Sequence, residues 1–206
     1  MQRYNLNRAK YGTHQLIAEE IGTNKTVLDI GCNKGYLKEL AKNNIFYGID
    51  YNKEDLELAK KRRYKEVFEL DLNNYELFKI DLKFDVIIFA GILEHLMFPE
   101  KVLNFFITNH LKSNGKVIIS LPNVANFTIR VGLLFGNFNY TESGILDKTH
   151  LHLYTLKSAK EFINRNNLEI IKEKFSSNRF GRIIEILPFL GTLLGYELIF
   201  VCQKEY

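Results

Sequence analysis

Short runs of β-branched and aromatic residues alternate along the chain with segments whose apolar residues recur at helical spacing. Apolar runs bounded by polar or turn residues are typical of strands, and apolar residues three or four positions apart are typical of amphipathic helices. Seven strands are therefore predicted, at residues 26–30, 45–49, 66–70, 85–89, 116–120, 168–175 and 197–203. Helices are predicted at residues 35–43, after Asn52, from Pro99 and at 155–167.

The ends of the predicted helices carry suitable residues. Asn52 is placed to cap a helix with Leu56 and Ala59 on its inner face, and Asp55 lies in its first turn, where negative charge is favourable. Pro99 suits the first position of the next helix. Strands that alternate with helices form a parallel sheet covered on both faces. The sequence thus predicts an α/β fold with a seven-stranded, mostly parallel sheet and helices on both faces.

Two segments interrupt this alternation. Residues 122–154, after the fifth strand, contain an amphipathic stretch followed by glycines, aromatic residues and histidines. We expect them to form an insertion over the strand ends, where a substrate lid would lie. Residues 178–195 separate two strands that a tight connection would normally join. Packing against the sheet edge is the favoured reading, with partner docking, or membrane contact through Arg179 and Arg182, as alternatives.

Composition adds bounds on the class of protein. The chain has 206 residues, 46% of them hydrophobic, which suits a single domain over residues 1–206. The net charge of +4 is mild, and the one dense basic run, at residues 60–63, ends a predicted helix, where the helix dipole favours it. No nucleic-acid partner is therefore expected.

Cysteine use and hydropathy bear on the compartment. Cys32 and Cys202 fit neither a disulfide framework nor a metal-ligand spacing, which favours a reducing compartment. Residues 1–5 lack the apolar core of a signal peptide. The most apolar stretch, residues 183–202, is interrupted by charged residues and a proline, short of a spanning helix. A soluble, cytoplasmic protein is expected.

The stretch VLDIGCNKGYL, at residues 27–37, carries the first candidate site. A strand that leads through Gly31 and Gly35 into a helix presents free backbone N–H groups at the edge where such sheets bind ligands. The spacing lacks two glycines of the dinucleotide fingerprint. Asp29 precedes the first glycine, and a carboxylate there suits an ammonium group better than a pyrophosphate.

Two further acids end strands in the same way. Asp50 lies about 20 residues further on, where an acid can accept from ribose hydroxyls. Asp71 follows the third strand and could accept from an adenine amine. Each of the three acids also has a plainer reading as a helix cap or turn residue. Taken together they predict a ligand with an ammonium group, a ribose and an adenine, which is the inventory of S-adenosylmethionine. Asp85 begins a strand, at the opposite edge, and is predicted to be structural.

These motifs resemble those of the class I S-adenosylmethionine-dependent methyltransferases. LDIGCNKG resembles the glycine loop of the family, and YGIDYN and ELDLNN resemble its two acid-bearing strand ends. FDVIIFAGILEHL resembles its fourth strand and the turn that follows. The resemblance implies a Rossmann-like fold over almost the whole chain, S-adenosylmethionine as cofactor and S-adenosylhomocysteine as product. Asn33 replaces a common glycine. The implied cofactor residues are Asp29, Gly31, Cys32, Asn33 and Gly35 around the methionine part, Asp50 and Tyr51 at the ribose, Asp71 and Leu72 at the adenine, and Ala90 and Gly91 on the far side.

The acceptor is less constrained. Residues 89–95 lack the Asn/Asp-Pro-Pro-Tyr/Phe motif of enzymes that methylate amino groups of adenine or glutamine, which favours hydroxyl or carbon acceptors. Residues 122–154 resemble the same stretch of methyltransferases associated with bacterial surface-glycan synthesis, and more loosely MetW-type proteins of methionine biosynthesis. Asp147 and His150 match the glycan-type pattern, whereas His152 stands where a basic residue is expected.

His150, oriented by Asp147, is the first candidate for the general base, and His95 beside Glu94 is the second. A capping or packing role is the alternative for His150. Strand-like alternation would place His150 and His152 on one side, but no third ligand follows at a convincing spacing, so no metal site is predicted. Aromatic residues of the insertion could stack on a sugar or pack within the lid: Phe135, Phe138 and Tyr140.

The sequence therefore predicts a methyltransferase that uses S-adenosylmethionine to methylate a hydroxyl of a sugar or glycan intermediate. One alternative is a small-metabolite O- or C-methyltransferase, or a MetW-like protein. Another is a non-catalytic protein that binds S-adenosylmethionine and regulates a partner. The oligomeric state is left open.

Overall fold

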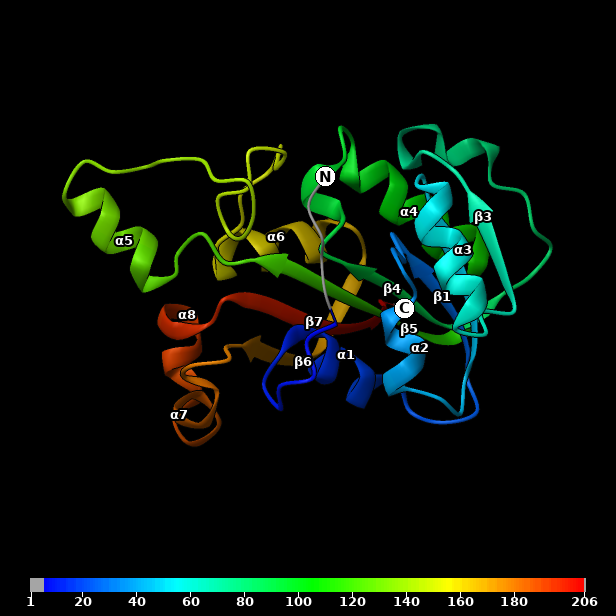
Figure 1. Cartoon of the computed structure of the whole chain (residues 1–206), viewed down its shortest axis with the longest axis horizontal. Coiled ribbons are helices and arrows are strands. Elements are labelled where there is room, and N and C mark those ends of the chain that lie inside the picture. Colours follow the sequence, from blue (N-terminus) through cyan, green and yellow to red (C-terminus); the bar gives the residue numbers. More distant parts are fainter. Residues whose placement is uncertain (1–5, 206) are drawn as a thin grey trace.

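The computed structural model describes residues 6–205. One sheet of seven strands runs through the molecule in the order β3-β2-β1-β4-β5-β7-β6 (Figure 1). Strands β1 to β5 are parallel, and β7 lies antiparallel between β5 and β6. The strands are β1 Thr26–Ile30, β2 Ile45–Asp50, β3 Glu66–Glu69, β4 Phe84–Ala90, β5 Leu111–Pro122, β6 Leu168–Ser176 and β7 Glu197–Lys204. The predicted sheet is confirmed. Residues 1–5, on which the expectation of no signal peptide rests, lie outside the described part.

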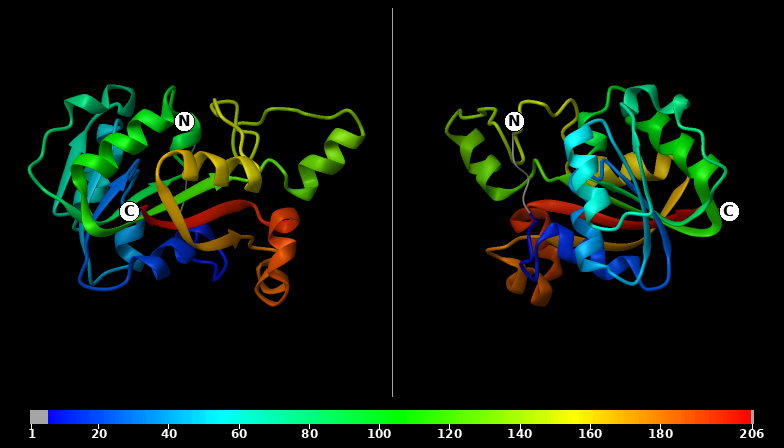
Figure 2. Two further views of the ribbon diagram at one scale, coloured as in Figure 1. Left: turned by 180° about the vertical axis from the view of Figure 1, so that it is seen from behind. Right: turned by 45° about the vertical axis from the view of Figure 1, so that its right-hand side comes forward.

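Helices cover both faces of the sheet (Figure 2). On one face, α1, α2 and α3 pack their apolar residues against the strands, and on the other face α4 and α6 do so. Their bounds are α1 Thr13–Ile21, α2 Tyr36–Leu40, α3 Lys53–Lys61, α4 Pro99–His110, α5 Phe127–Leu134, α6 Leu156–Arg165, α7 Gly181–Ile186 and α8 Gly191–Leu194. Three short 3-10 helices complete the set: η1 Leu72–Leu77, η2 Leu93–His95 and η3 Pro188–Leu190.

The core follows from the two-residue period of the buried strands. In β4, Val86 and Ile88 face the layer of α1 to α3, and Ile87 and Phe89 face the layer of α4 and α6. All four side chains are fully buried. An unbroken apolar run is what a central parallel strand needs, because both of its faces are covered.

Local signals position the helices. The Asn52 side chain accepts from the Asp55 N–H at 3.1 Å, as the sequence predicts, and such a cap stabilises a helix by about 1 kcal/mol. Asp85 is structural, as expected: its Oδ2 accepts from the Thr26 N–H at 2.8 Å and its Oδ1 pairs with Lys112 at 2.8 Å. The prediction of a helix over 35–43 is too long at both ends. Gly35 adopts φ +75° before the helix, and Ala41 leaves helical geometry after it.

The two interrupting segments both leave the sheet at the carboxyl ends of its parallel strands. Residues 122–154 follow β5, and α5 projects beyond the sheet rather than over it (Figure 1). The end of this segment returns to the strand ends, where the Leu151 and His152 N–H groups donate to the Glu94 carbonyl at 2.8 and 3.1 Å. Residues 178–195 form α7, η3 and α8 beside it. Among the described residues, no helix is both long and apolar enough to span a bilayer.

Candidate functional site

The turn after β1 brings backbone close to the carboxyl edge of the sheet. Gly31 and Gly35 have φ of +74° and +75°, and Asn33 has φ +47°, a conformation that asparagine tolerates better than most residues. A Cβ on Gly31 would lie 3.0 Å from Ile92, and the N–H groups of Gly31 and Cys32 both donate to the Ile49 carbonyl. The turn therefore needs its small residues for shape, and asparagine is an acceptable replacement at position 33.

Asp50 ties this turn to the end of β2. Its Oδ2 accepts from the Asn33 N–H at 2.8 Å, and its Oδ1 accepts from the Asn52 N–H at 2.9 Å. Burial raises the pKa of Asp50, and these backbone hydrogen bonds partly oppose that effect. Each carboxylate oxygen has a second lone pair, so a ligand hydroxyl can still be accepted at this strand end.

Asp29 is more deeply placed than its sequence position suggests. Its carboxyl is buried and accepts from the Tyr64 hydroxyl at 2.6 Å. Burial raises the pKa of Asp29 to about 7, with the Tyr64 hydrogen bond opposing and Asp50 adding to the shift. A cation close to this strand end would be favoured by the two acids. Tyr64, which the sequence did not single out, holds the Asp29 carboxyl. The expected contact of Asp29 with a ligand ammonium group stays a prediction.

The remaining expected cofactor residues surround the same edge. Asp71 is the N-cap of η1 and accepts from the Asn73 N–H at 2.9 Å, which is the plainer of its two predicted roles. Leu72 is buried behind it, and the neighbouring Tyr51 side chain is 72% exposed. Across the edge, Ala90 ends β4 and Gly91 turns the chain with φ +62°. Contacts of these residues with an adenine or a ribose stay predictions.

A cluster of histidines and acids lies next to that turn. His95, in η2, and His150, in the returning segment, are in edge-to-face contact with ring centroids 4.7 Å apart. His150 Nδ1 lies 3.1 Å from the Ile145 carbonyl oxygen, which can only accept, so Nδ1 carries the proton. In the neutral ring Nε2 is then the free acceptor, and it lies 4.0 Å from Glu94 Oε1.

Asp147 acts mainly through Thr149. Its Oδ1 accepts from the Thr149 N–H at 2.8 Å and from the Thr149 hydroxyl at 2.7 Å, and that hydroxyl lies 3.1 Å from His95 Nδ1. The His150 Nδ1–H donates to the Ile145 carbonyl, so this carbonyl orients the ring, and the expected orientation of His150 by Asp147 stays a prediction. Asp147 still raises the pKa of His150 through its charge.

Burial sets the charge state of this cluster. It lowers the pKa of both His95 and His150, so both imidazoles are neutral near pH 7. Burial raises the pKa of Glu94 to about 8 and also raises the pKa of Glu197. Neutral imidazoles beside a Glu94 carboxyl whose pKa lies near 8 can accept and donate protons without a net charge in the pocket.

Four buried side-chain atoms in residues 6–205 have no hydrogen-bond partner: His14 Nδ1, Glu94 Oε2, Ser120 Oγ and Glu197 Oε2. All four belong to residues at the carboxyl edge, since Ser120 pairs in register near the end of β5, Glu197 begins the antiparallel β7, and His14 contacts Tyr36 at the start of α2. An unpaired buried polar atom costs about 1–3 kcal/mol, so each of these atoms is open to a hydrogen bond from a water molecule or from a polar ligand.

Sequence reasoning missed most of these atoms. Glu197 was noticed only because it interrupts an apolar stretch, and neither His14 nor Ser120 stands in a recognisable motif. Their proximity depends on α1 and β7 lying beside β5, which no local pattern reveals. The acids at the strand ends were found because each lies within two residues of the end of its own strand.

The His150 and His152 side chains do not act as a pair. His152 Nε2 lies 3.0 Å from the Leu96 carbonyl and its ring is near that of Tyr154, whereas His150 Nδ1 lies 3.1 Å from the Ile145 carbonyl, so the two histidines have different partners. Glu94, His95 and His150 instead offer one ligand atom each, all within 4.8 Å of one another. This set has the donor types of a divalent cation site as well as those of a proton-transfer site.

The sheet order, the glycine turn after β1 and the acids at successive strand ends define an α/β enzyme of the Rossmann-like methyltransferase fold. A family model described as a methyltransferase domain matches residues 1–173, so the chain belongs to that family.

Two named relatives and one solved structure are similar to this chain, and they match different shares of its length. A putative methyltransferase of Invertebrate iridescent virus 6 is 30% identical over 203 residues, covering 89% of this chain and 74% of that protein. A mitochondrial ubiquinone biosynthesis O-methyltransferase of Candida albicans is 33% identical over 107 residues, covering 48% of this chain and only 32% of that protein. Magnesium protoporphyrin IX methyltransferase from Synechocystis, solved with bound S-adenosylhomocysteine, superposes with a TM-score of 0.64 at 16% identity, covering 99% and 90% of the two chains.

Proposed function

We propose that the protein transfers the methyl group of S-adenosylmethionine to a hydroxyl of a sugar or glycan intermediate. The observation that carries this proposal is the arrangement of His150 at the carboxyl edge. Its Nδ1 proton is held by a backbone carbonyl, its Nε2 is free, and burial lowers its pKa. A neutral imidazole in that state is suited to take a proton from an acceptor hydroxyl.

The residues at the edge fit the cofactor. The glycine turn lets a ligand approach the backbone, Asp50 can accept from ribose hydroxyls, and the buried acids Asp29 and Asp50 favour a cation that carries no phosphate. His14 Nδ1, which has no partner in the protein, lies on the same side of the turn and is available to the methionine part. When bound, S-adenosylmethionine would supply a sulfonium methyl group: in-line attack at the methyl carbon breaks its bond to sulfur, and S-adenosylhomocysteine leaves as the neutral thioether.

The chain's own residues then position and deprotonate the acceptor. The hydroxyl proton moves to His150 Nε2 as the oxygen gains the methyl group, and the other ring proton stays on Nδ1, hydrogen-bonded to the Ile145 carbonyl. A base of this kind contributes roughly 10²–10⁴-fold to the rate, and alignment of the two reactants contributes further. His95, positioned by Thr149 and Asp147, is the second candidate for this role.

The polar lining supports an acceptor with several hydroxyl groups. Glu94, Ser120 and Glu197 each present a buried oxygen with no partner, and sugars can satisfy such atoms as both donors and acceptors. Phe138 and Tyr140 form an exposed edge-to-face pair in the same insertion, a surface on which a sugar ring can stack. The resemblance of residues 122–154 to glycan-associated methyltransferases points the same way.

A small metabolite with a hydroxyl group is the second candidate acceptor. It is favoured by the identity of 33% with the ubiquinone biosynthesis O-methyltransferase, although the match covers only 32% of that protein. Cytoplasmic location, expected from the sequence, remains part of the proposal.

The test is a transfer assay with methyl-labelled S-adenosylmethionine and a panel of nucleotide sugars, glycan extracts and hydroxylated aromatic metabolites, read by mass spectrometry. His150→Gln should lower turnover by roughly 10²–10⁴-fold with unchanged cofactor affinity. His110→Gln is the matched control, because His110 also places Nδ1 near a backbone carbonyl but at the opposite edge. Cofactor binding without methylation of any compound in the panel would favour the non-catalytic, regulatory alternative.

A further inference from the structure

Two helical segments at one end of the molecule expose apolar side chains that the fold does not use. In α5 no residue is buried, and Leu134 and Phe135 are 83% and 78% exposed. In α7 and η3, Ile186 and Phe189 are 68% and 71% exposed. We call the exposed apolar side chains of α5, α7 and η3 the tip surface. Packing against the sheet edge, the reading favoured for residues 178–195 on sequence alone, accounts for Ile184 and Gly191, which are buried, but not for these residues.

The two segments are held together at their base. The Asn126 side chain donates to the Gly195 carbonyl at 2.8 Å, and the Asn123 side chain donates to the carbonyls of Thr192 and Gly195 at 3.0 Å. The rings of Phe127 and Phe180 are in edge-to-face contact at 5.7 Å. Figure 1 shows α5 and α7–α8 on the same side of the molecule, α5 above and α7 below the level of the sheet. The tip surface is thus drawn from two interrupting segments that contact each other at their base.

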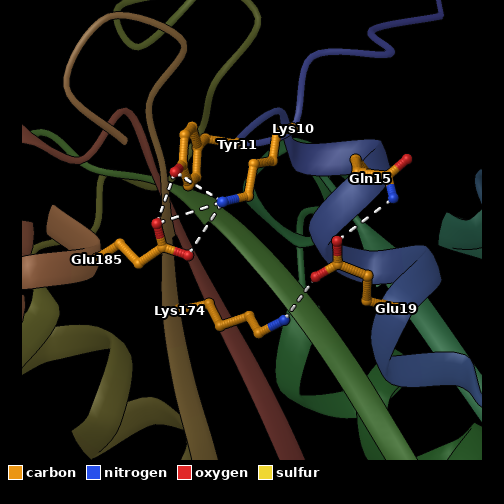
Figure 3. Close-up of polar contacts among 6 residues, drawn as sticks. All are labelled: Lys10, Tyr11, Gln15, Glu19, Lys174 and Glu185. Atoms are coloured by element: carbon orange, nitrogen blue, oxygen red, sulfur yellow. Dashed lines mark hydrogen bonds and ion pairs between the residues drawn. The ribbon is translucent and has the colours of Figure 1, made fainter. Parts of the chain in front are cut away.

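The charges around the tip surface are basic. Residues 124–140 contain Arg130 and no acid, and residues 178–195 contain Arg179 and Arg182 against the single acid Glu185. Glu185 is neutralised from within the protein: it lies 3.2 Å from Lys10 Nζ and accepts from the Tyr11 hydroxyl at 2.6 Å (Figure 3). A partner that fits the tip surface therefore has an apolar interior and negative charge at its boundary.

We propose that the tip surface docks onto an anionic lipid bilayer, with the apolar side chains at the boundary between headgroups and acyl chains and the arginines among the headgroups. Short apolar helices rimmed by basic residues bind membranes in this way without spanning them. A second copy of the chain is disfavoured as the occupant, because a two-fold contact would place this surface, with its three arginines, against an identical basic surface. The docked surface adjoins the edge that holds Glu94 and His150, so an acceptor carried by a lipid would reach that edge from the membrane.

The test is flotation of the full chain with vesicles of phosphatidylcholine alone and of phosphatidylcholine mixed with phosphatidylglycerol. The protein should float with the anionic vesicles, weakly or not at all with the neutral ones, and less well at high salt. The double variant Phe135→Ser, Phe189→Ser should bind the anionic vesicles at least about tenfold more weakly. Arg179→Gln should lower the same affinity by about fivefold.

Ile45→Ser is the matched control, since Ile45 is also exposed but begins β2 at the opposite edge of the sheet; it should bind vesicles as the wild type does. Unchanged melting temperatures of the tip variants would show that they fold. The proposal is overturned if the wild type does not bind anionic vesicles, or if the double variant binds them equally well. It is also overturned if the wild type is a dimer in solution that the double variant abolishes, since the occupant would then be a second copy. Binding needs no turnover, so failure here is separate from failure of the proposed reaction.

Discussion

The two halves of the sheet present different surfaces at their shared carboxyl edge. In the half formed by β1, β2 and β3, the turns are short, the acids are bonded to backbone or to Tyr64, and the glycines fit tightly. In the half formed by β5, β7 and β6, long insertions leave the strands, and two buried oxygens, Ser120 Oγ and Glu197 Oε2, have no hydrogen-bond partner within residues 6–205. The first half carries the residues proposed to hold the cofactor, and the second carries the long segments proposed to hold the acceptor.

The largest expected difference between the two halves is the loss of stability when one methyl group is added to a glycine in each. A Cβ on Gly35 would lie 2.7 Å from Tyr64 and 2.9 Å from Ala59, whereas a Cβ on Gly136 meets nothing within 4 Å. Both glycines have nearly equal φ, +75° and +74°. Gly35→Ala should lower the free energy of unfolding by about 3 kcal/mol and Gly136→Ala by about 1 kcal/mol, measured by denaturant melts. Equal losses would show that the turn after β1 is no more tightly packed than an open loop.

The next largest effect concerns the two acids of the cofactor half. Asp50→Asn places an amide N–H against backbone donors and removes a charged acceptor, so the dissociation constant for S-adenosylhomocysteine should rise roughly 10–100-fold by calorimetry. Asp71 is an exposed cap, and asparagine caps equally well, so Asp71→Asn should change the same constant by less than about threefold. A larger increase of this constant in Asp71→Asn than in Asp50→Asn would mean that the ligand is held mainly at the end of β3.

The loops that follow each strand directly were predictable from sequence, and contacts between distant segments were not. The positive φ of Gly31 and Gly35, the cap at Asn52 and the structural role of Asp85 all follow from residues next to a strand or helix end. The approach of Glu197 and His14 to the edge depends on tertiary packing of β7 and α1. The amphipathic stretch expected after β5 forms helix α5, but none of its residues is buried, because a local pattern does not reveal whether the chain offers a surface to cover it.

A smaller effect on the acceptor half is a pH dependence of stability. Burial raises the pKa of Glu94 to about 8 in the folded chain from 4.5, so the folded state holds a proton that the unfolded state releases, and stability falls as pH rises towards 8. The lowered pKa values of His95 and His150 act in the opposite sense, but only below about pH 6.5. Between pH 6.5 and 8 the wild type should lose on the order of 1 kcal/mol more than Glu94→Gln, by melts without ligand. A parallel pH profile in the two proteins would remove Glu94 as a buried neutral acid.

Removal of metal ions is expected to have no effect on methyl transfer. If His150 is a base, dialysis against a chelator should leave methyl transfer unchanged, with the melting temperature as a second readout. Loss of transfer that a divalent cation restores would instead make Glu94, His95 and His150 metal ligands, since their donor atoms lie within 4.8 Å of one another.

The central claim is that the cofactor binds at the carboxyl edge beside Asp50. A crystal structure with S-adenosylhomocysteine would measure its position. We predict ribose hydroxyls within hydrogen-bond distance of Asp50, backbone of the Gly31–Gly35 turn against the methionine part, and the sulfur facing the side of the edge that holds Glu94 and His150. A nucleoside bound elsewhere, or an Asp50 carboxylate that contacts only Asn33 and Asn52 in the complex, would contradict it.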